Sequence, residues 1–295
     1  MTDESTTLEP PPPTRRKFLR RAFKGCLVGG AAALGYAYAI EPHWIDVERQ
    51  RLPIANLPAN LDGRKLVQIS DIHVGPAVGD LHIRRAFSEV ADLQPDMIVM
   101  TGDYLTTDWG EEVDHALDVF QHLPQTPLGR FACLGNHDYG RHGNYWKTAD
   151  RMTHGFYDLG IRVLRNEVIE VAGLQIAGID ELLMRRCLIK ATLRQLDPQR
   201  AMLTLCHNPD AVDQPGWEDF QGWILSGHTH GGQCKLPGFD PMVTPVFNKR
   251  YSAGAFQLGG NRQMYINRGL GYVHRVRFNC RPEITLFTLE RAATS

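Results

Sequence analysis

Five short motifs in this chain carry side chains that bind divalent cations. In chain order they are Asp71-Ile72-His73, Gly102-Asp103, Gly135-Asn136-His137-Asp138, the single residue His207, and Gly227-His228-Thr229-His230. Carboxylate and amide oxygens together with neutral imidazoles suit manganese, iron or zinc, and no thiolate is among them. The motifs supply more ligands than one tetrahedral ion accepts. We therefore expect two ions about 3.5–4 Å apart, sharing a carboxylate and a bridging hydroxide that attacks phosphorus in line.

Each motif begins where a predicted strand ends. The apolar runs 64–70, 96–101, 130–134, 201–206 and 222–226 precede Asp71, Asp103, Asn136, His207 and His228. Amphipathic segments at 80–93, 111–122 and 145–159 are predicted helices, and their alternation with strands is typical of βαβ units. Ligands bind beyond the carboxyl ends of strands in open α/β sheets, so the five motifs should converge on one edge.

The second half of the chain is rich in predicted strands. Further strands are expected at 161–164, 167–171 and 174–179, with one helix-like segment at 188–196. Gly and Pro cluster between 231 and 260, which predicts a long loop there. Composition and periodicity alone indicate an α/β fold.

The five motifs, in this order, resemble the signature of the calcineurin-like metallophosphoesterase family over roughly residues 60–290. The resemblance implies a four-layer αββα sandwich and a dinuclear centre, with manganese expected and iron or zinc as alternatives. By motif, it implies that one metal is bound by Asp71, His73 and His230, the other by Asn136, His207 and His228, and that Asp103 bridges them. Two further segments resemble those of a bacterial subgroup of exported or membrane-linked members: His207-Asn208-Pro209-Asp210 and Asn267-Arg268-Gly269-Leu270-Gly271.

His137 is expected to be catalytic and not to bind metal. In the family that the chain resembles, this histidine lies beside the phosphate and assists the leaving group as an acid or stabilises charge. The resemblance makes Asp138 the residue that orients it, fixing its tautomer and raising its basicity. His142, in the loop that follows, is a further candidate to reach substrate.

Differences from other groups of the family narrow the range of reactions that we expect. Tyr104 follows Asp103 where Ser/Thr protein phosphatases have Asp-Arg-Gly, and the acid after His137 is Asp and not Glu. Thr106 occupies the position at which purple acid phosphatases carry a tyrosine. Both groups are therefore disfavoured, and small or lipid-linked phosphoesters remain.

Residues 1–39 are predicted to be a twin-arginine-type signal peptide or membrane anchor. The segment Arg15-Arg16-Lys17-Phe18-Leu19-Arg20 resembles a twin-arginine export signal and leads into the apolar run 26–40. At about fifteen residues, this run is shorter than the roughly 20 that a membrane-spanning helix needs. Ala37-Tyr38-Ala39 is a candidate cleavage site, and an uncleaved tether is the alternative.

Export by the twin-arginine machinery would follow folding, so the metals could be loaded in the cytoplasm. We expect residues 40–295 to form a single metallophosphoesterase domain that is periplasmic or attached to the outer face of the cytoplasmic membrane. The formal net charge of −1 provides no field to gather nucleic acid, so no nucleic-acid partner is expected. Six cysteines without a C-x-x-C pair argue against a disulfide framework.

The function expected from the residues and the resemblance is phosphodiester hydrolysis, with His137 as the acid. One alternative is a pyrophosphatase of the UDP-2,3-diacylglucosamine type in lipid A metabolism. Another is an exported metal-binding envelope protein without turnover, although such a protein does not need His137 and Asp138. Apolar residues of the 231–260 loop could contact an acyl chain or pack on the domain: Phe239, Met242, Val243, Val246 and Phe247.

Overall fold

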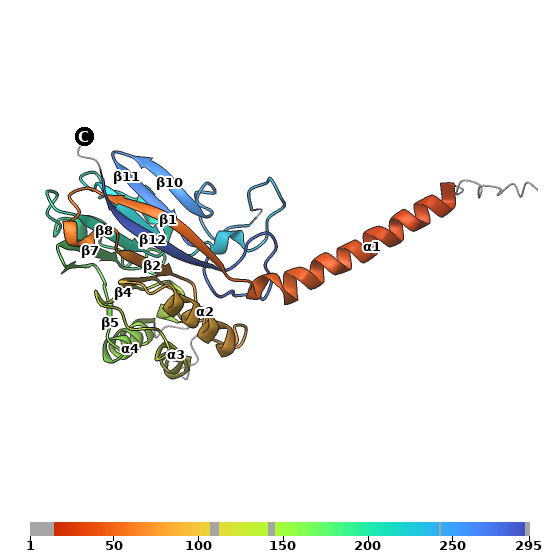
Figure 1. The fold of residues 1–295 in the computed structure, drawn as a ribbon, viewed down its shortest axis with the longest axis horizontal. Helices are drawn as coiled ribbons and strands as arrows, with labels where there is room; N and C mark the ends of the chain where they lie inside the picture. Colours follow the sequence, from red (N-terminus) through yellow and green to blue (C-terminus); the bar gives the residue numbers. More distant parts are fainter. Residues whose placement is uncertain (1–14, 107–111, 141–144, 242, 293–295) are drawn as a thin grey trace, which may run out of the picture.

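The central strands of the fold are runs of apolar residues with no acidic side chain, as strands buried on both faces require. The computed structural model describes residues 15–106, 112–140, 145–241 and 243–292. Two six-stranded sheets lie face to face, and helices cover the outer face of the first (Figure 1). The predicted α/β class is confirmed.

The first sheet has the strand order β1-β12-β2-β3-β4-β5. Its strands are β1 (Asp46–Ile54), β12 (Glu283–Arg291), β2 (Lys65–Ile69), β3 (Met97–Thr101), β4 (Arg130–Cys133) and β5 (Ile161–Val163). The run from β2 to β5 is parallel, whereas β12 pairs antiparallel with β2 and parallel with β1. Consequently β2, β3 and β4 all present their carboxyl ends at one edge.

The second sheet has the order β10-β11-β9-β8-β7-β6. Its strands are β10 (Gly254–Gly259), β11 (Arg262–Ile266), β9 (Gly222–Ser226), β8 (Met202–Cys206), β7 (Leu174–Ile179) and β6 (Glu167–Val171). The four central strands are parallel, and β6 and β10 are antiparallel to their neighbours at the two edges.

Helices α2 (Asp80–Asp92), α3 (Glu112–Phe120) and α4 (Tyr145–Asp158) lie on the outer face of the first sheet (Figure 1). Among the described residues, the outer face of the second sheet is covered by the short helix α5 (Ile189–Leu193) and irregular segments. These include the short 3₁₀ helix η4 (Pro209–Asp213). The other 3₁₀ turns are η1 (Glu41–His43), η2 (Ala59–Leu61), η3 (His137–Tyr139) and η5 (His230–Gly232). The four layers are present, and the fourth is thin.

Alternating side chains of each central strand fill two different layers of core. In β3, Ile98 and Met100 join the core beneath the helices, whereas Met97 and Val99 join the core between the sheets. The same period of two holds across the other central strands, as expected for a strand covered on both faces. This packing holds the two sets of strand ends next to each other.

Four strands were missing from the sequence prediction, and one of them lies in a predicted loop. Strands β1, β11 and β12 were not foreseen. The segment 231–260 was expected to be one loop, but its last part is β10, which forms a hairpin with β11. Gly259-Gly260-Asn261 all have positive φ and supply the turn, so these glycines end a strand and do not mark irregular chain.

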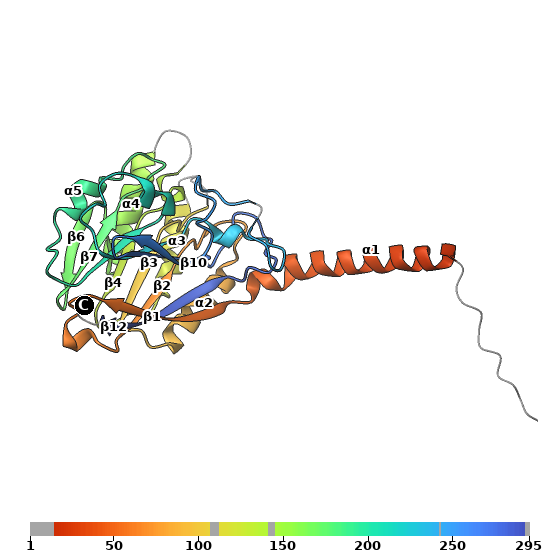
Figure 2. The same cartoon turned by 90° about the horizontal axis from the view of Figure 1, so that it is seen from above.

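Helix α1 (Arg15–Ala39) projects from the domain as a single straight rod (Figures 1 and 2). Among its described residues only Ala37 is buried. The helix includes the basic segment as well as the apolar run 26–40, so it is longer than the apolar run alone. In the described part of the chain, α1 with η1 is the one helical segment long and apolar enough to cross a membrane.

All six cysteines are free in this structure. His142 lies outside the described residues. Of the loop residues predicted to contact either lipid or core, Val246 is buried, Phe239, Val243 and Phe247 are exposed, and Met242 lies outside the described residues.

Tyr104 ties the end of β3 to β4. Its buried hydroxyl donates to Cys133 O at 2.6 Å and accepts from the Gly102 amide at 3.2 Å. Burial raises the pKa of Tyr104, so the hydroxyl stays protonated and forms hydrogen bonds with backbone groups.

We expect Tyr104→Phe to lower the free energy of unfolding by about 1–3 kcal/mol, because it leaves buried backbone groups without their partner. Urea denaturation monitored by circular dichroism measures this. Tyr157→Phe is the matched control, since Tyr157 is exposed on α4. A loss of bound metal without a loss of stability would contradict the structural role.

His82 lies in the first turn of α2, where its Nε2 is 3.2 Å from Leu270 O and its ring packs against His43. Burial lowers the pKa of His82 to about 4, below its ordinary value of 6.5. The unfolded chain therefore takes up a proton at higher pH than the folded chain does. His82 costs nothing above pH 6.5 and destabilises the fold increasingly as pH falls toward 4.

We expect His82→Gln to flatten the loss of stability between pH 6.5 and 4, by up to about 3 kcal/mol. Thermal unfolding followed at a series of pH values measures the slope, and His154→Gln, which alters an exposed histidine of α4, should leave it unchanged. Identical slopes for wild type and His82→Gln would show that His82 is already protonated in the fold.

Candidate metal centre

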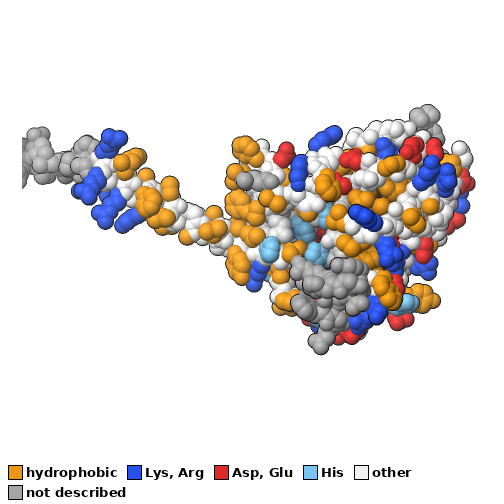
Figure 3. Space-filling model, turned by 180° about the vertical axis from the view of Figure 1, so that it is seen from behind, with side chains coloured by type: hydrophobic (Ala, Val, Ile, Leu, Met, Phe, Trp, Pro, Cys, Tyr) orange, Lys and Arg blue, Asp and Glu red, His pale blue; other side chains and the backbone are white. Residues whose placement is uncertain are grey.

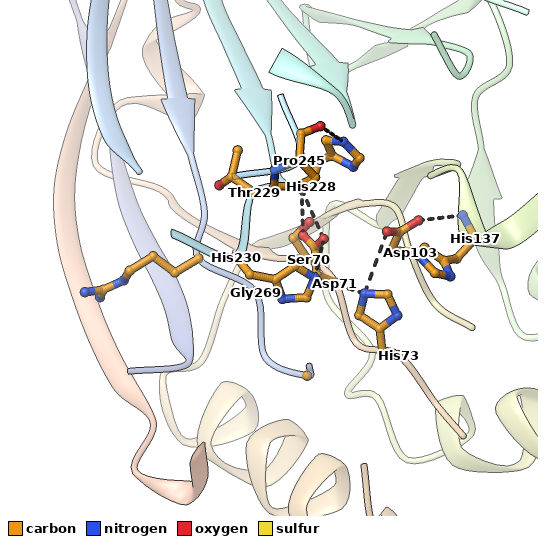
Figure 4. A network of polar contacts seen from close by, with 12 residues as sticks. Ser70, Asp71, His73, Asp103, His137, His228, Thr229, His230, Pro245 and Gly269 are labelled. Carbon is orange, nitrogen blue, oxygen red and sulfur yellow. Dashed lines mark hydrogen bonds and ion pairs between the residues drawn. The ribbon is translucent and has the colours of Figure 1, made fainter. Parts of the chain in front are cut away.

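The predicted ligands meet at the edge where strands of both sheets end, and Figure 4 shows five of them: Asp71, His73, Asp103, His228 and His230. Asp71 follows β2, Asp103 follows β3, Asn136 follows β4, His207 follows β8 and His228 follows β9. Three groups of carboxylate and imidazole atoms form there, each with its ligand atoms within 4.8 Å of one another. The groups are Asp71, His73 and His230; His73, Asp103 and His137; and Asp103, His207 and His228.

The first group brings together Asp71, His73 and His230. His230 Nε2 lies 3.0 Å from His73 Nε2 and 3.4 Å from Asp71 Oδ1. Adjacent ligands held about 2.1 Å from one ion are about 3.0–3.4 Å apart. The three atoms therefore have the spacing of ligands to a single cation.

The second group brings together Asp103, His207 and His228. His207 Nε2 lies 3.3 Å from Asp103 Oδ2 and 3.1 Å from His228 Nδ1. Asp103 Oδ2 is also 3.7 Å from His73 Nε2 in the first group. This one carboxylate oxygen thus lies between the two sets of ligands.

Two polar atoms at the centre have no hydrogen-bond partner among the described residues. They are Asn136 Oδ1 and His230 Nδ1, both buried. Leaving such an atom unpaired costs about 1–3 kcal/mol, so the amide oxygen in particular calls for a partner that the chain does not supply. A cation beside Asn136 would satisfy it.

Backbone carbonyls set the tautomers of three histidines. The ring nitrogens of His73, His207 and His228 that point away from the centre lie 3.1, 2.6 and 3.1 Å from Leu105 O, Thr101 O and Pro245 O. Each carbonyl accepts the N–H, which turns the other nitrogen, with its lone pair, toward the centre. This is the arrangement that metal-binding histidines require.

The charge states also suit cation binding. Burial lowers the pKa of His73 to about 3 and that of His228 to about 4, and it holds the pKa of His230 well below its usual range. Burial would lower the pKa of His207 as well, but the Asp103 carboxylate raises it to about 10. Three rings are therefore neutral at pH 7, and a cation at Asp103 would replace the positive charge of His207.

Five of the seven predicted ligands have left-handed backbone conformations. The φ angles are 50° at Asp71, 52° at His73, 56° at Asp103, 69° at His228 and 51° at His230. Each such residue costs of order 1–3 kcal/mol, and the surrounding structure must impose it. Strain of this kind, concentrated in residues that share a site, marks a functional constraint.

Glycines let these loops approach one another closely. A Cβ at Gly135 would lie 2.2 Å from Asp103 Oδ1, and one at Gly227 would lie 2.3 Å from Asp71 Oδ2. Both positions exclude any larger residue. The glycines of the motifs are thus part of how the carboxylates are placed.

His137 lies at the rim of the centre, partly exposed, with its ring edge-to-face against His73 at 4.8 Å between centroids. Its amide donates to Asp103 Oδ1 at 2.9 Å, and its Nδ1 lies 2.7 Å from Thr106 O. The ring is therefore oriented by a backbone carbonyl.

The structure corrects the role expected for Asp138. Its carboxylate does not hold the His137 ring; it accepts from the amides of Asp103, Tyr104 and Gly135 at 2.7–3.0 Å. Residue 138 lies one position after His137 in a 3₁₀ turn, so its side chain points inward, toward the loop after β3. Asp138 positions the backbone around Asp103 and does not touch the reacting region directly.

The segment 267–271 contributes to the centre in a way that the spacing of ligand types did not reveal. Gly271 N donates to Asp71 O at 2.7 Å, and a Cβ at Gly269 would lie 2.7 Å from that of Asp71. The buried guanidinium of Arg277 donates to Gly269 O and Gly271 O. Only the resemblance of Asn267-Arg268-Gly269-Leu270-Gly271 to known relatives could have drawn attention to it.

Comparison with known proteins agrees with this site. The family model described as calcineurin-like phosphoesterase matches residues 64–232. The chain is 34% identical over 288 residues to the uncharacterized metallophosphoesterase YkuE of Bacillus subtilis, covering 94% of this chain and 98% of the relative. It is 31% identical over 286 residues to the phosphodiesterase YaeI of Escherichia coli, covering 94% and 99%.

A third relative is the UDP-2,3-diacylglucosamine pyrophosphatase LpxG of Chlamydia trachomatis, 28% identical over 303 residues and covering 85% of this chain and 91% of the relative. The family match includes all five motifs, and the described side chains of those motifs meet at one edge of the sheets. The chain therefore belongs to the calcineurin-like phosphoesterase family, whose members are metal-dependent phosphoester hydrolases.

Proposed function

We propose that this protein is a dinuclear metal-dependent phosphodiesterase. One ion would be held by Asp71, His73 and His230, and the other by Asn136, His207 and His228. The observation that carries this proposal is the position of Asp103, whose Oδ2 lies 3.7 Å from a histidine of one set and 3.3 Å from a histidine of the other. A carboxylate so placed can serve both ions, and manganese is the metal we expect.

Bound divalent ions would supply an activated water and neutralise charge on the phosphoryl oxygens. The chain's own groups complete the site. Neutral His73, His228 and His230 offer lone pairs, while His137 at the rim is the group with access to solvent. With Nδ1 donating to Thr106 O, protonated His137 would give its Nε2 proton to the leaving oxygen.

A diester is favoured over other substrates by the similarity to the phosphodiesterase YaeI. The similarity to LpxG keeps a nucleotide-linked lipid pyrophosphate as the second candidate. A metal-binding protein without turnover is less well supported, because metal storage gives no reason for a solvent-accessible His137 beside the two sets of ligands.

We further propose that α1 directs the chain to the outer face of the cytoplasmic membrane. Arg15, Arg16, Lys17, Arg20, Arg21 and Lys24 all lie in its first three turns. Basic residues at one end of an apolar helix keep that end on the cytoplasmic side. The domain at the other end would then lie outside, exported after folding by the twin-arginine machinery and either tethered by α1 or released by cleavage after Ala39.

Hydrolysis of bis-(p-nitrophenyl) phosphate with added manganese tests the metal and acid roles. We expect Asp103→Ala to lose both activity and bound metal, because both sets of ligands depend on that carboxylate. His137→Ala should keep two metal equivalents while kcat falls about 10²–10⁴-fold, the usual contribution of a general acid. Metal content is measured by mass spectrometry of the purified protein.

The control for this comparison is His154→Ala, which alters an exposed histidine of α4 and should change neither value. Absence of metal-dependent activity in the wild type above the Asp103→Ala background would refute the enzyme proposal. Loss of metal from His137→Ala would make His137 a ligand.

Export is tested by Arg15→Lys/Arg16→Lys. We expect the doubly substituted precursor to remain in the cytoplasm, because the twin-arginine receptor discriminates between guanidinium and ammonium groups that carry the same charge. Cell fractionation followed by immunoblotting measures the distribution. Substitution of Arg20→Lys/Arg21→Lys is the matched control, and equal export of both variants would contradict this route.

A further inference from the structure

A loop with an exposed apolar tip leaves the metal centre and returns to it. Segment 231–247 begins directly after His230, and Pro245 O near its end lies 3.1 Å from His228 Nε2. Between these points Leu236, Phe239 and Val243 are 57%, 71% and 76% exposed. Large apolar side chains so exposed beside a polar centre indicate a surface that meets another apolar phase.

The same end of the domain carries the base of α1. Arg277 N donates to Ala37 O at 2.9 Å, and the next residue, Phe278, accepts through its carbonyl from the Lys235 amide at 3.0 Å. The end of α1 and the loop are therefore both hydrogen-bonded to the segment that contains Arg277 and Phe278. Both ribbon views show the loop after η5 beside the base of α1 (Figures 1 and 2).

Three more exposed apolar side chains surround this junction: Tyr38, Ile40 and Trp44, which are half or more exposed. We call the six residues Tyr38, Ile40, Trp44, Leu236, Phe239 and Val243 the docking surface. Figure 3 shows hydrophobic side chains gathered where α1 joins the domain, with histidine side chains in a hollow beside them.

The aromatic members of the docking surface are paired with arginines. The guanidinium of Arg275 lies 5.0 Å from the ring centre of Tyr38, and that of Arg281 lies 3.6 Å from the ring centre of Trp44. Aromatic rings beside long basic side chains are typical of the membrane–water interface, where the ring enters the apolar region and the charge stays with the head groups.

Helix α1 determines which phase covers this surface. Its uncharged part, residues 25–39, gives a length of about 22 Å, and the long basic side chains of Arg20, Arg21 and Lys24 can reach the head groups, so that α1 fits a hydrocarbon core of about 30 Å. Tyr38 belongs to its last turn, so a bilayer that holds α1 must end at the docking surface. Asp240, next to Phe239, is exposed and limits the loop to the head-group region.

We infer that the docking surface rests on the lipid bilayer and places the mouth of the metal centre at the head-group layer. The substrate class that follows is a phosphodiester carried by a membrane amphiphile, whose phosphate reaches the ions while its acyl chains stay in the bilayer. This substrate class rests on the proposed phosphodiesterase function, whereas contact with the bilayer rests only on the retention of α1 as a tether.

Contact is tested with the full chain reconstituted in vesicles of phosphatidylethanolamine and phosphatidylglycerol. A photoactivatable benzoylphenylalanine replaces Phe239 in one sample and Tyr157, an exposed residue of α4, in the other. We expect lipid adducts, detected by mass spectrometry, at position 239 and not at 157. Adducts at both positions or at neither would overturn the inference, as would a cross-link from 239 to a second copy of the chain.

The substrate class is tested with two p-nitrophenyl phosphodiesters, one soluble and one carrying a diacylglycerol in the same vesicles. For Leu236→Ser/Phe239→Ser/Val243→Ser we expect an unchanged rate on the soluble diester and a rate about tenfold or more lower on the vesicle diester. Tyr157→Ser should alter neither.

If the triple variant loses activity equally on both diesters, the loop only supports the metal centre. If the variant hydrolyses both diesters as fast as wild type does, the loop has no role in substrate access. If wild type hydrolyses neither diester, the proposed function fails, while the lipid adduct still decides whether the surface meets the bilayer.

Discussion

The carboxylate of Asp103 is buried between two sets of imidazoles, and most of the surrounding structure serves to keep it there. Burial alone would raise the pKa of Asp103, but the charges of His207 and His137 hold it well below its usual range. An ionised carboxylate in such a place needs counter-charge. The histidine proton supplies it in the metal-free chain, and divalent ions would supply it in the loaded enzyme.

The need to hold Asp103 in this position explains why the surrounding loops contain strained backbone conformations. Five predicted ligands adopt left-handed backbone conformations, and glycines such as Gly135 allow contacts that no side chain would permit. Asp138 offsets part of the cost, because its carboxylate accepts from three amides around the loop after β3. On the opposite side Arg277 holds the 267–271 segment through its carbonyls. Two buried polar side chains thus stabilise the backbone on either side of the centre without entering it.

The same end of the fold joins the centre to α1. Cys280 N donates to the carboxylate of Glu41 in η1, and Cys280 Sγ lies 3.3 Å from the carbonyl of the ligand His230. A short chain of contacts therefore runs from the base of α1 to the predicted metal ligands. The position of the centre relative to a bilayer would be set by packed backbone and not by a free linker.

The sequence by itself determined the candidate ligands and the strands that deliver them. Apolar runs ending in Asp71, Asp103, Asn136, His207 and His228 were enough to predict one shared edge, since parallel strands present their carboxyl ends together. It did not reveal β1, whose polar residues 46–51 leave little apolar pattern and which forms only by pairing with β12 from the far end of the chain. Contacts between segments so distant in sequence carry no local signal.

Only the tertiary structure decided what the neighbouring side chains do. Asp138 adjoins His137 in sequence, yet a 3₁₀ turn directs it to backbone amides, and Thr106 O orients the histidine in its place. Likewise the apolar residues of the 231–260 segment divide between a buried Val246, exposed Phe239 and Val243, and a strand. Residue type determines which chemistry a side chain can perform, whereas the direction of the backbone at that residue determines which partner it meets.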